Sequence, residues 1–189
     1  MKTHLIIIIL AFSMHSFAQD TIEVKCDSIY QNKEIIIKLF KFNDEEDGYF
    51  GEKNSVLIIE QKGKTIIKDS IFSKIQEVTF EDYNNDNFKD ILIQNTSDVR
   101  SNWTYYLYLY NPKTSTFKKV KWFEQIKNPK NNLKDNIVES YVVSGQNWVG
   151  FYIIKENKAI DLNIEIIDDQ SESFEKNYQK AIKKIKAKK

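Results

Sequence analysis

The stretch SVLIIEQKGKTIIKDSI, residues 55–71, sets the pattern on which the fold is built. Its two halves alternate apolar and polar side chains, which is typical of strands that bury one face. Between them, Gln61-Lys62-Gly63-Lys64 predicts a hairpin turn in which glycine supplies the backbone freedom. The stretch therefore predicts two adjacent antiparallel strands.

Period-two alternation recurs along most of the remaining chain, without a clear internal repeat. The further segments expected to be strands are residues 33–42, 75–80, 90–94, 104–110, 117–122, 137–143, 148–155 and 159–167. Sequential antiparallel strands with few helical patterns predict an all-β fold of about eight to ten strands. We expect an antiparallel β-sandwich or a propeller-like sheet assembly.

The closing segment, about residues 171–189, changes to a helical period. Ser171 or Asp169 is the expected N-cap, and the lysines occupy the face opposite the apolar side chains. The apolar face should dock on the β-domain; it comprises Phe174, Tyr178, Ala181, Ile182 and Ile185.

The first 18 residues have the order of an export signal. Lys2 precedes an apolar run, residues 5–12, and Ser16-Phe17-Ala18 forms a small-residue cleavage site. The run is too short to span a bilayer. We expect a signal peptide over residues 1–18, a single domain over residues 19–189, and a periplasmic or secreted protein.

Cleavage would remove both histidines, His4 and His15, and leave Cys26 as the one cysteine. Histidine-dependent triads and Cys/His zinc sites are then excluded, and Cys26 is expected to be a small buried residue. Without Lys2 the chain holds 27 basic and 27 acidic residues, and Arg100 is its one arginine. This charge pattern argues against nucleic-acid binding.

Residues 82–90, DYNNDNFKD, carry the sharpest site signal. Side-chain oxygens at loop positions 1, 3, 5 and 9, with a backbone carbonyl at position 7, form a donor set that Ca²⁺ prefers. An EF-hand is rejected because position 12 is Ile93 rather than a bidentate Glu. The predicted metal ligands are Asp82, Asn84, Asp86, Phe88 and Asp90.

This loop resembles the short calcium loop of integrin-type FG-GAP repeats, Asp-x-Asn-x-Asp-Gly-x-x-Asp. Asn87 stands where those repeats have Gly, and Asn tolerates the left-handed backbone better than most residues. The alternative is a solvated Asp/Asn turn without metal. Repulsion among three aspartates favours the ion, for which we expect a structural role.

Two further segments are candidates for binding. In the aromatic strand, Tyr106, Tyr108 and Tyr110 share one face, which predicts either ordinary sheet packing or a strip that contacts carbohydrate or protein. The second segment, VVSGQNWVG at residues 142–150, is a polar loop between two strands. Taken alone, it is a hairpin loop.

Taken together, three segments resemble the exported, calcium-binding, I-type lysozyme-inhibitor-like proteins, which include immunity proteins against lysozyme-like effectors. The segments are the 82–93 loop and strand, the strand and turn at 106–114, and Ser140-Tyr141 leading to Ser144-Gly145. In that family a Ser-Gly-x-x-Tyr loop enters the active-site cleft of the target. The resemblance implies partner-binding roles for Ser144, Gly145 and Trp148, with Trp in place of Tyr.

The expected function is therefore a non-enzymatic, calcium-stabilised periplasmic inhibitor of a lysozyme-like peptidoglycan hydrolase. The alternative is a secreted adhesion or glycan-binding module in which Trp103, Tyr106 and Tyr108 contact sugar. A hydrolase would need two facing carboxylates among Glu60, Asp90 and Glu139. The acidic loop at residues 43–48 and the lysine-rich end are expected to be solvated.

Overall fold

The computed structural model describes residues 21–42 and 52–187, and it is built mainly of antiparallel strands. Twelve strands, one short 3-10 helix and one α-helix follow each other along this part of the chain. Their bounds are β1 Thr21–Lys25, β2 Ile35–Lys41, β3 Ser55–Gln61, β4 Lys64–Ile71, β5 Val78–Glu81, β6 Asp90–Ser97, β7 Trp103–Asn111, β8 Thr116–Lys119, η1 Phe123–Gln125, β9 Pro129–Asn132, β10 Ile137–Val142, β11 Trp148–Lys155, β12 Lys158–Ile167 and α1 Glu172–Lys186.

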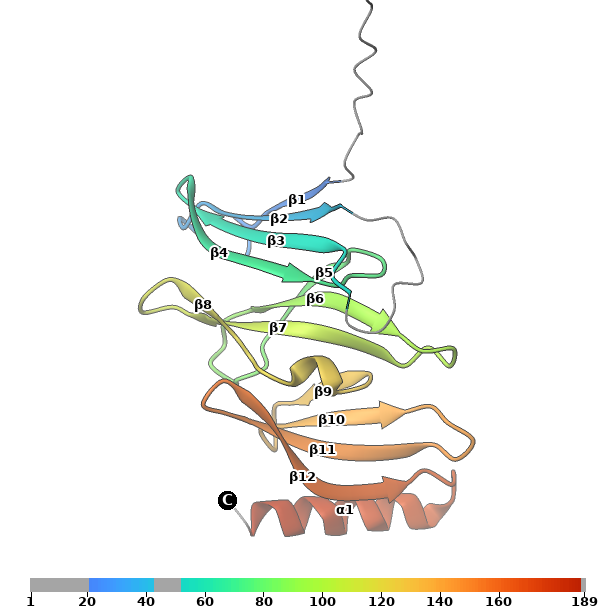
Figure 1. Cartoon of the computed structure of the whole chain (residues 1–189). Coiled ribbons are helices and arrows are strands. Elements are labelled where there is room, and N and C mark those ends of the chain that lie inside the picture. The colour runs from blue at the N-terminus through green and yellow to red at the C-terminus, as the bar shows by residue number, and fades with distance from the viewer. Residues whose placement is uncertain (1–20, 43–51, 188–189) are drawn as a thin grey trace, which may run out of the picture.

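The strands form three four-stranded sheets, each a meander of neighbours in sequence: β1 to β4, β5 to β8, and β9 to β12. We call them the first, second and third sheet. Figure 1 shows them stacked in chain order, with α1 lying beyond the third sheet. The all-β antiparallel class and the C-terminal helix are thus confirmed. The sequence did not indicate that a four-stranded antiparallel meander occurs three times.

Three apolar cores lie between the four layers. The core between the first and second sheets includes Ile37, Leu57 and Ile93, all fully buried. The next core joins Leu107 of the second sheet to Val138 of the third, and the last joins the third sheet to α1. Because the second sheet is covered on both faces, β6 is buried at every position from Asp90 to Gln94.

Most predicted strands are present with small changes at their ends, and β11 has the predicted bounds. Two strands were not predicted. β9 lies between the predicted strands at 117–122 and 137–143, and its sequence, PKNN, has no apolar alternation that would indicate a strand. Its proline is the first strand residue and β9 is an edge strand, a position where a missing N–H is tolerated. β1 pairs along β2 and is largely exposed.

α1 begins as predicted, with Ser171 as N-cap and with Asp169 accepting a hydrogen bond from the Ser171 N–H at 3.0 Å. Ala181, Ile182 and Ile185 are buried against the third sheet. The docking of its apolar face is confirmed.

Cys26 is fully buried, as predicted. Burial and the charge of Asp27 raise the pKa of its thiol to about 11. The predicted signal peptide at residues 1–18 and the acidic loop at residues 43–48 lie outside the described residues. No helix in the described part of the chain is long and apolar enough to cross a membrane.

Candidate functional site

The loop predicted to bind calcium connects β5 to β6, at the margin of the second sheet. Asn85 and Asn87 take left-handed backbone angles, with φ of 60° and 66°. Asn87 thus adopts the conformation for which glycine is common, as its position predicted. The sequence folds into a tight turn here because asparagine accepts both of these strained positions.

The carboxylate of Asp82 organises the turn by accepting hydrogen bonds from the loop's own backbone. Its Oδ1 accepts the N–H of Asn85 at 2.7 Å, and its Oδ2 accepts the N–H of Asn87 at 2.9 Å. Asp86 Oδ1 accepts the N–H of Phe88 at 2.9 Å, and Asp86 Oδ2 accepts from the Asn84 amide at 3.0 Å. Both carboxylates are therefore held by donors of the loop itself, Asp82 by backbone N–H groups and Asp86 by one backbone N–H and one side-chain amide.

Asp90, at the other end of the loop, is completely buried. Its two carboxylate oxygens accept the backbone N–H groups of Tyr83 and Tyr110, each at 2.8 Å. Burial, together with the charges of Asp86 and Asp82, raises the pKa of Asp90 to about 7, although the two backbone hydrogen bonds lower it. A buried carboxylate close to two others is a position that a cation would stabilise.

The donor chemistry of the loop fits a hard cation. Four side chains and the carbonyl of Phe88 offer oxygen atoms, the donor type that Ca²⁺ takes. Within residues 21–42 and 52–187, however, no three acidic, histidine or cysteine side chains converge tightly enough to hold a metal ion. Binding would therefore require the loop side chains to move closer to a common centre; a carboxylate has enough lone pairs to accept a backbone N–H and bind a cation together.

The same loop is tied to the other two sheets by contacts that the sequence did not predict. The Tyr30 hydroxyl, from the β1–β2 connection, donates to the carbonyl of Lys89 at 2.9 Å. The Tyr83 hydroxyl donates to the carbonyl of Pro129 in β9 at 3.1 Å, and the Asn131 amide donates to the carbonyl of Asp82. The loop is thus a junction of all three sheets.

The second predicted site, at Ser144 and Gly145, is the hairpin loop between β10 and β11. Gly145 and Gln146 are exposed, and a side chain added at Gly145 would meet no atom within 4 Å. Ser144 N–H donates to the Asn147 side chain at 3.0 Å, and the Asn147 carbonyl accepts from Asp168 N–H at 2.8 Å. The loop is exposed at its tip and held at its base.

One buried asparagine links this loop to the neighbouring β6–β7 turn. Asn102 is 2% exposed; its Oδ1 accepts Val143 N–H at 2.8 Å, and its amide donates to the Val143 carbonyl at 2.9 Å. The same amide donates to Asp98 Oδ2 at 2.8 Å. Asn102 therefore fixes the two loops relative to each other, and both project from the same side of the stack (Figure 1).

Trp148 lies at the base of the hairpin loop and not at its tip. It is the first residue of β11, it is half-buried, and its ring lies over Gly150, so that a Cβ added there would be 2.9 Å from the Trp148 ring. The ring thus occupies the space that a side chain at position 150 would need. The structure brings Ser144 and Gly145 together and places Trp148 behind them.

The tyrosine row of β7 packs between sheets. Tyr108 and Tyr110 are 1% and 3% exposed, and they belong to the core between the first and second sheets. The Tyr108 hydroxyl donates to Asp69 Oδ2 at 2.7 Å, and the Tyr106 hydroxyl accepts from Phe72 N–H at 3.4 Å. The row is sheet packing, so an exposed carbohydrate strip on these tyrosines is wrong.

The three carboxylates considered for hydrolysis lie in three different sheets. Glu60 in β3 pairs with Lys38 at 2.8 Å, and Asp90 is held by backbone N–H groups. Glu139 in β10 accepts from the Tyr178 hydroxyl at 2.5 Å. Each has its own partners, and the fold does not bring any two of them into one site.

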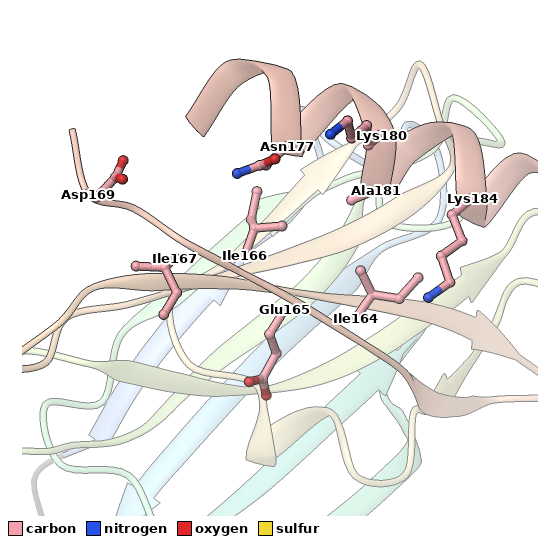
Figure 2. A pocket seen from close by; sticks show the side chains of 9 residues that line it. All are labelled: Ile164, Glu165, Ile166, Ile167, Asp169, Asn177, Lys180, Ala181 and Lys184. Carbon is pink, nitrogen blue, oxygen red and sulfur yellow. The ribbon is translucent and has the colours of Figure 1, made fainter. Parts of the chain in front are cut away.

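A shallow groove runs between β12 and α1, and the sequence did not predict it. Figure 2 shows Ile164 and Ile166 directed toward the helix, with Lys180 and Lys184 on the helix side. Its volume is about 390 Å³, and its lining mixes isoleucines with lysines and with the carboxylates Glu165 and Asp169. This mixture of both charges defines no ligand chemistry.

Comparison with known proteins gives one informative match. No family model matches the chain, and no curated protein matches it. A solved structure described as a Xanthomonas type IV secretion system related protein is similar, with a TM-score of 0.51 and 14% sequence identity. The match covers 83% of this chain and 86% of that one. At this identity, the likeness shows that the two proteins share a fold.

Proposed function

We propose that this protein is an exported inhibitor of a lysozyme-like peptidoglycan hydrolase, and that the Ser144 loop enters the active-site cleft of its target. The observation that carries the proposal is the β10–β11 loop itself, which is exposed at Gly145 and Gln146 and anchored on both sides. A loop held in its binding conformation loses little entropy on binding. The secretion-related description of the structurally similar protein fits an exported role.

The chemistry of the tip suits a site that contains carboxylates. Glycoside hydrolases act with a pair of Asp or Glu side chains. Ser144 has a hydroxyl that donates to the Gln146 carbonyl, and it can exchange this partner for a carboxylate. The backbone N–H groups of Gly145 and Gln146 have no partner among the described residues, so they are further donors.

Calcium in this proposal stabilises the scaffold and does not touch the target. The ligands would be the side chains of Asp82, Asn84, Asp86 and Asp90 with the carbonyl of Phe88. The calcium loop ends at Asp90, the first residue of β6. The turn at Asp98, which contacts the Ser144 loop through Asn102, follows the other end of this strand. The calcium loop and the Ser144 loop are therefore separated by the length of β6. At about 3.3 Å per residue this is roughly 23 Å.

The glycan-binding alternative depended on an exposed row of tyrosines. Tyr106 and Tyr108 instead pack against the first sheet. The three carboxylates considered for a hydrolase, Glu60, Asp90 and Glu139, lie in three different sheets and do not form the facing pair that glycoside hydrolysis needs. Inhibition of a hydrolase is the function that the exposed, anchored loop supports best.

The test is turbidity-monitored lysis of cell walls by a panel of lysozymes, with and without the mature protein. Gly145→Arg adds bulk at the tip where the structure has open space, so it should abolish inhibition without unfolding the protein. Thr114→Arg, in the exposed β7–β8 turn, adds the same side chain elsewhere and should inhibit like the wild type.

Chelation of calcium completes the design. It should lower the melting temperature, while inhibition persists at temperatures where the protein stays folded. Equal inhibition by Gly145→Arg and wild type would exclude insertion of this loop. Failure to inhibit any lysozyme in the panel would remove the inhibitor proposal and leave the scaffold description unchanged.

A further inference from the structure

The turn that follows β6 lies directly beside the proposed inhibitory loop. Residues 98–102 connect β6 to β7, and the Asn102 amide joins this turn to the backbone of Val143 on both its N–H and its carbonyl. Asn128 adds a third attachment, because its amide donates to Asn102 Oδ1 at 3.1 Å. These bonds fix the base of the turn against the base of the Ser144 loop.

The turn is also rigid by itself. Asp98 Oδ1 accepts the backbone N–H of Arg100 at 2.9 Å and that of Asn102 at 3.1 Å. Lys127 Nζ lies 3.1 Å from Asp98 Oδ2 and offsets its charge. The carboxylate of Asp98 is thus bound by groups of the protein itself. The tip of the turn therefore has a fixed conformation before any partner binds.

Two side chains at the tip are left for an external contact. Val99 is fully exposed, with a relative exposure of 101%, and Arg100 is exposed beside it. Arg100 is the one arginine of the sequence, and among the described residues it enters no salt bridge. A planar guanidinium with five N–H donors suits paired binding of a carboxylate.

We infer that Val99 and Arg100 form a second contact of the inhibitor, in which Arg100 binds a carboxylate on the target beside the cleft that the Ser144 loop enters. This inference rests on the proposed function. The two loops then act as one preformed surface, with a small polar tip and an adjacent cation. The partner is a hydrolase whose cleft is bordered by acidic side chains.

The experiment measures dissociation constants for a lysozyme that the wild-type protein inhibits, at low and at moderate ionic strength. Arg100→Gln keeps the length of the side chain and removes its charge. Lys113→Gln removes one charge from an exposed position in the β7–β8 turn, at the other end of β7, and is the matched control. Arg100→Lys keeps the charge but loses the paired hydrogen bonds.

Arg100→Gln should weaken binding about tenfold and should reduce its salt dependence, as loss of an interfacial charge pair does. Arg100→Lys should be intermediate, and Lys113→Gln should stay within about twofold of wild type. If Arg100→Gln binds like Lys113→Gln while Gly145→Arg does not bind, the second contact is wrong and the inhibitor proposal stands. If the wild type binds no lysozyme, both proposals fail.

Discussion

The buried carboxylate of Asp90 gives the sharpest test of the calcium loop, through the dependence of stability on pH. Its pKa is about 7 in the folded protein against an ordinary value of 3.8, because burial disfavours the charged form. Between these values the folded state holds a proton that the unfolded state has lost, so stability falls as pH rises. At about 1.4 kcal/mol per pKa unit, the loss by pH 7.5 is about 4 kcal/mol.

The assay is urea unfolding in the presence of a chelator, at several pH values between about 4 and 7.5, repeated with saturating calcium. A bound cation favours the ionised carboxylate, so calcium should flatten the decline and raise the free energy of unfolding most at the high-pH end. Asp90→Asn is the control because it cannot ionise. It should be less stable at about pH 4, since one amide oxygen replaces two acceptors for Tyr83 and Tyr110, and its decline with rising pH should be smaller.

The control is needed because Glu81, which is exposed, also has a pKa raised by desolvation and contributes a decline of the same sign. Asp69, by contrast, has a pKa below its ordinary value. Burial alone would raise this pKa, but hydrogen bonds from Lys119 and Tyr108 outweigh the effect of burial. The influence of Asp69 on stability therefore lies at lower pH. A free energy of unfolding that stays level or rises from pH 4 to pH 7 in chelator would refute the protonated Asp90. An unchanged decline in calcium would refute binding of the ion.

Three further substitutions test the other contacts. Asn102→Ala should cost about 2–3 kcal/mol in urea unfolding, because it leaves buried backbone groups without partners, whereas Asn111→Ala at the exposed end of β7 should cost under about 1 kcal/mol. Ile182→Asp should cost about 3 kcal/mol by placing a charge between α1 and the third sheet; a change below 1 kcal/mol would show that the helix is not docked. Gly150→Ala should displace the Trp148 ring, seen as a shift of its indole N–H resonance, at a cost of about 1 kcal/mol; an unmoved resonance would contradict the close approach.

The sequence was sufficient for features that depend on local pattern. Alternation located β11 from Trp148 to Lys155, and the helical spacing of Ala181, Ile182 and Ile185 located the buried face of α1. It was insufficient for β9, whose four polar residues pair as an edge strand through the backbone. Periodicity indicates a strand only when one face carries buried apolar side chains. β9 has no such face, so the pattern gives no signal for it.

The candidate sites show the same limit. Spacing indicated a candidate calcium loop from Asp82 to Asp90, but not the hydrogen bonds from Tyr30 and Asn131, which come from distant parts of the chain. Nothing in the local sequence indicates that Asn102 is buried beside Val143, because that contact depends on how the second and third sheets pack. Contacts between layers become visible only when the layers are assembled.

The chain-order stacking of the sheets has a consequence for how the molecule assembles. Every strand ladder joins neighbours in sequence, so each sheet can form from its own segment of the chain at low entropic cost. Bonds such as Tyr30 to Lys89, 59 residues apart, unite sheets that have already formed. We expect sheet-by-sheet opening in native-state hydrogen exchange, and a single uniform opening free energy for all three sheets would contradict it.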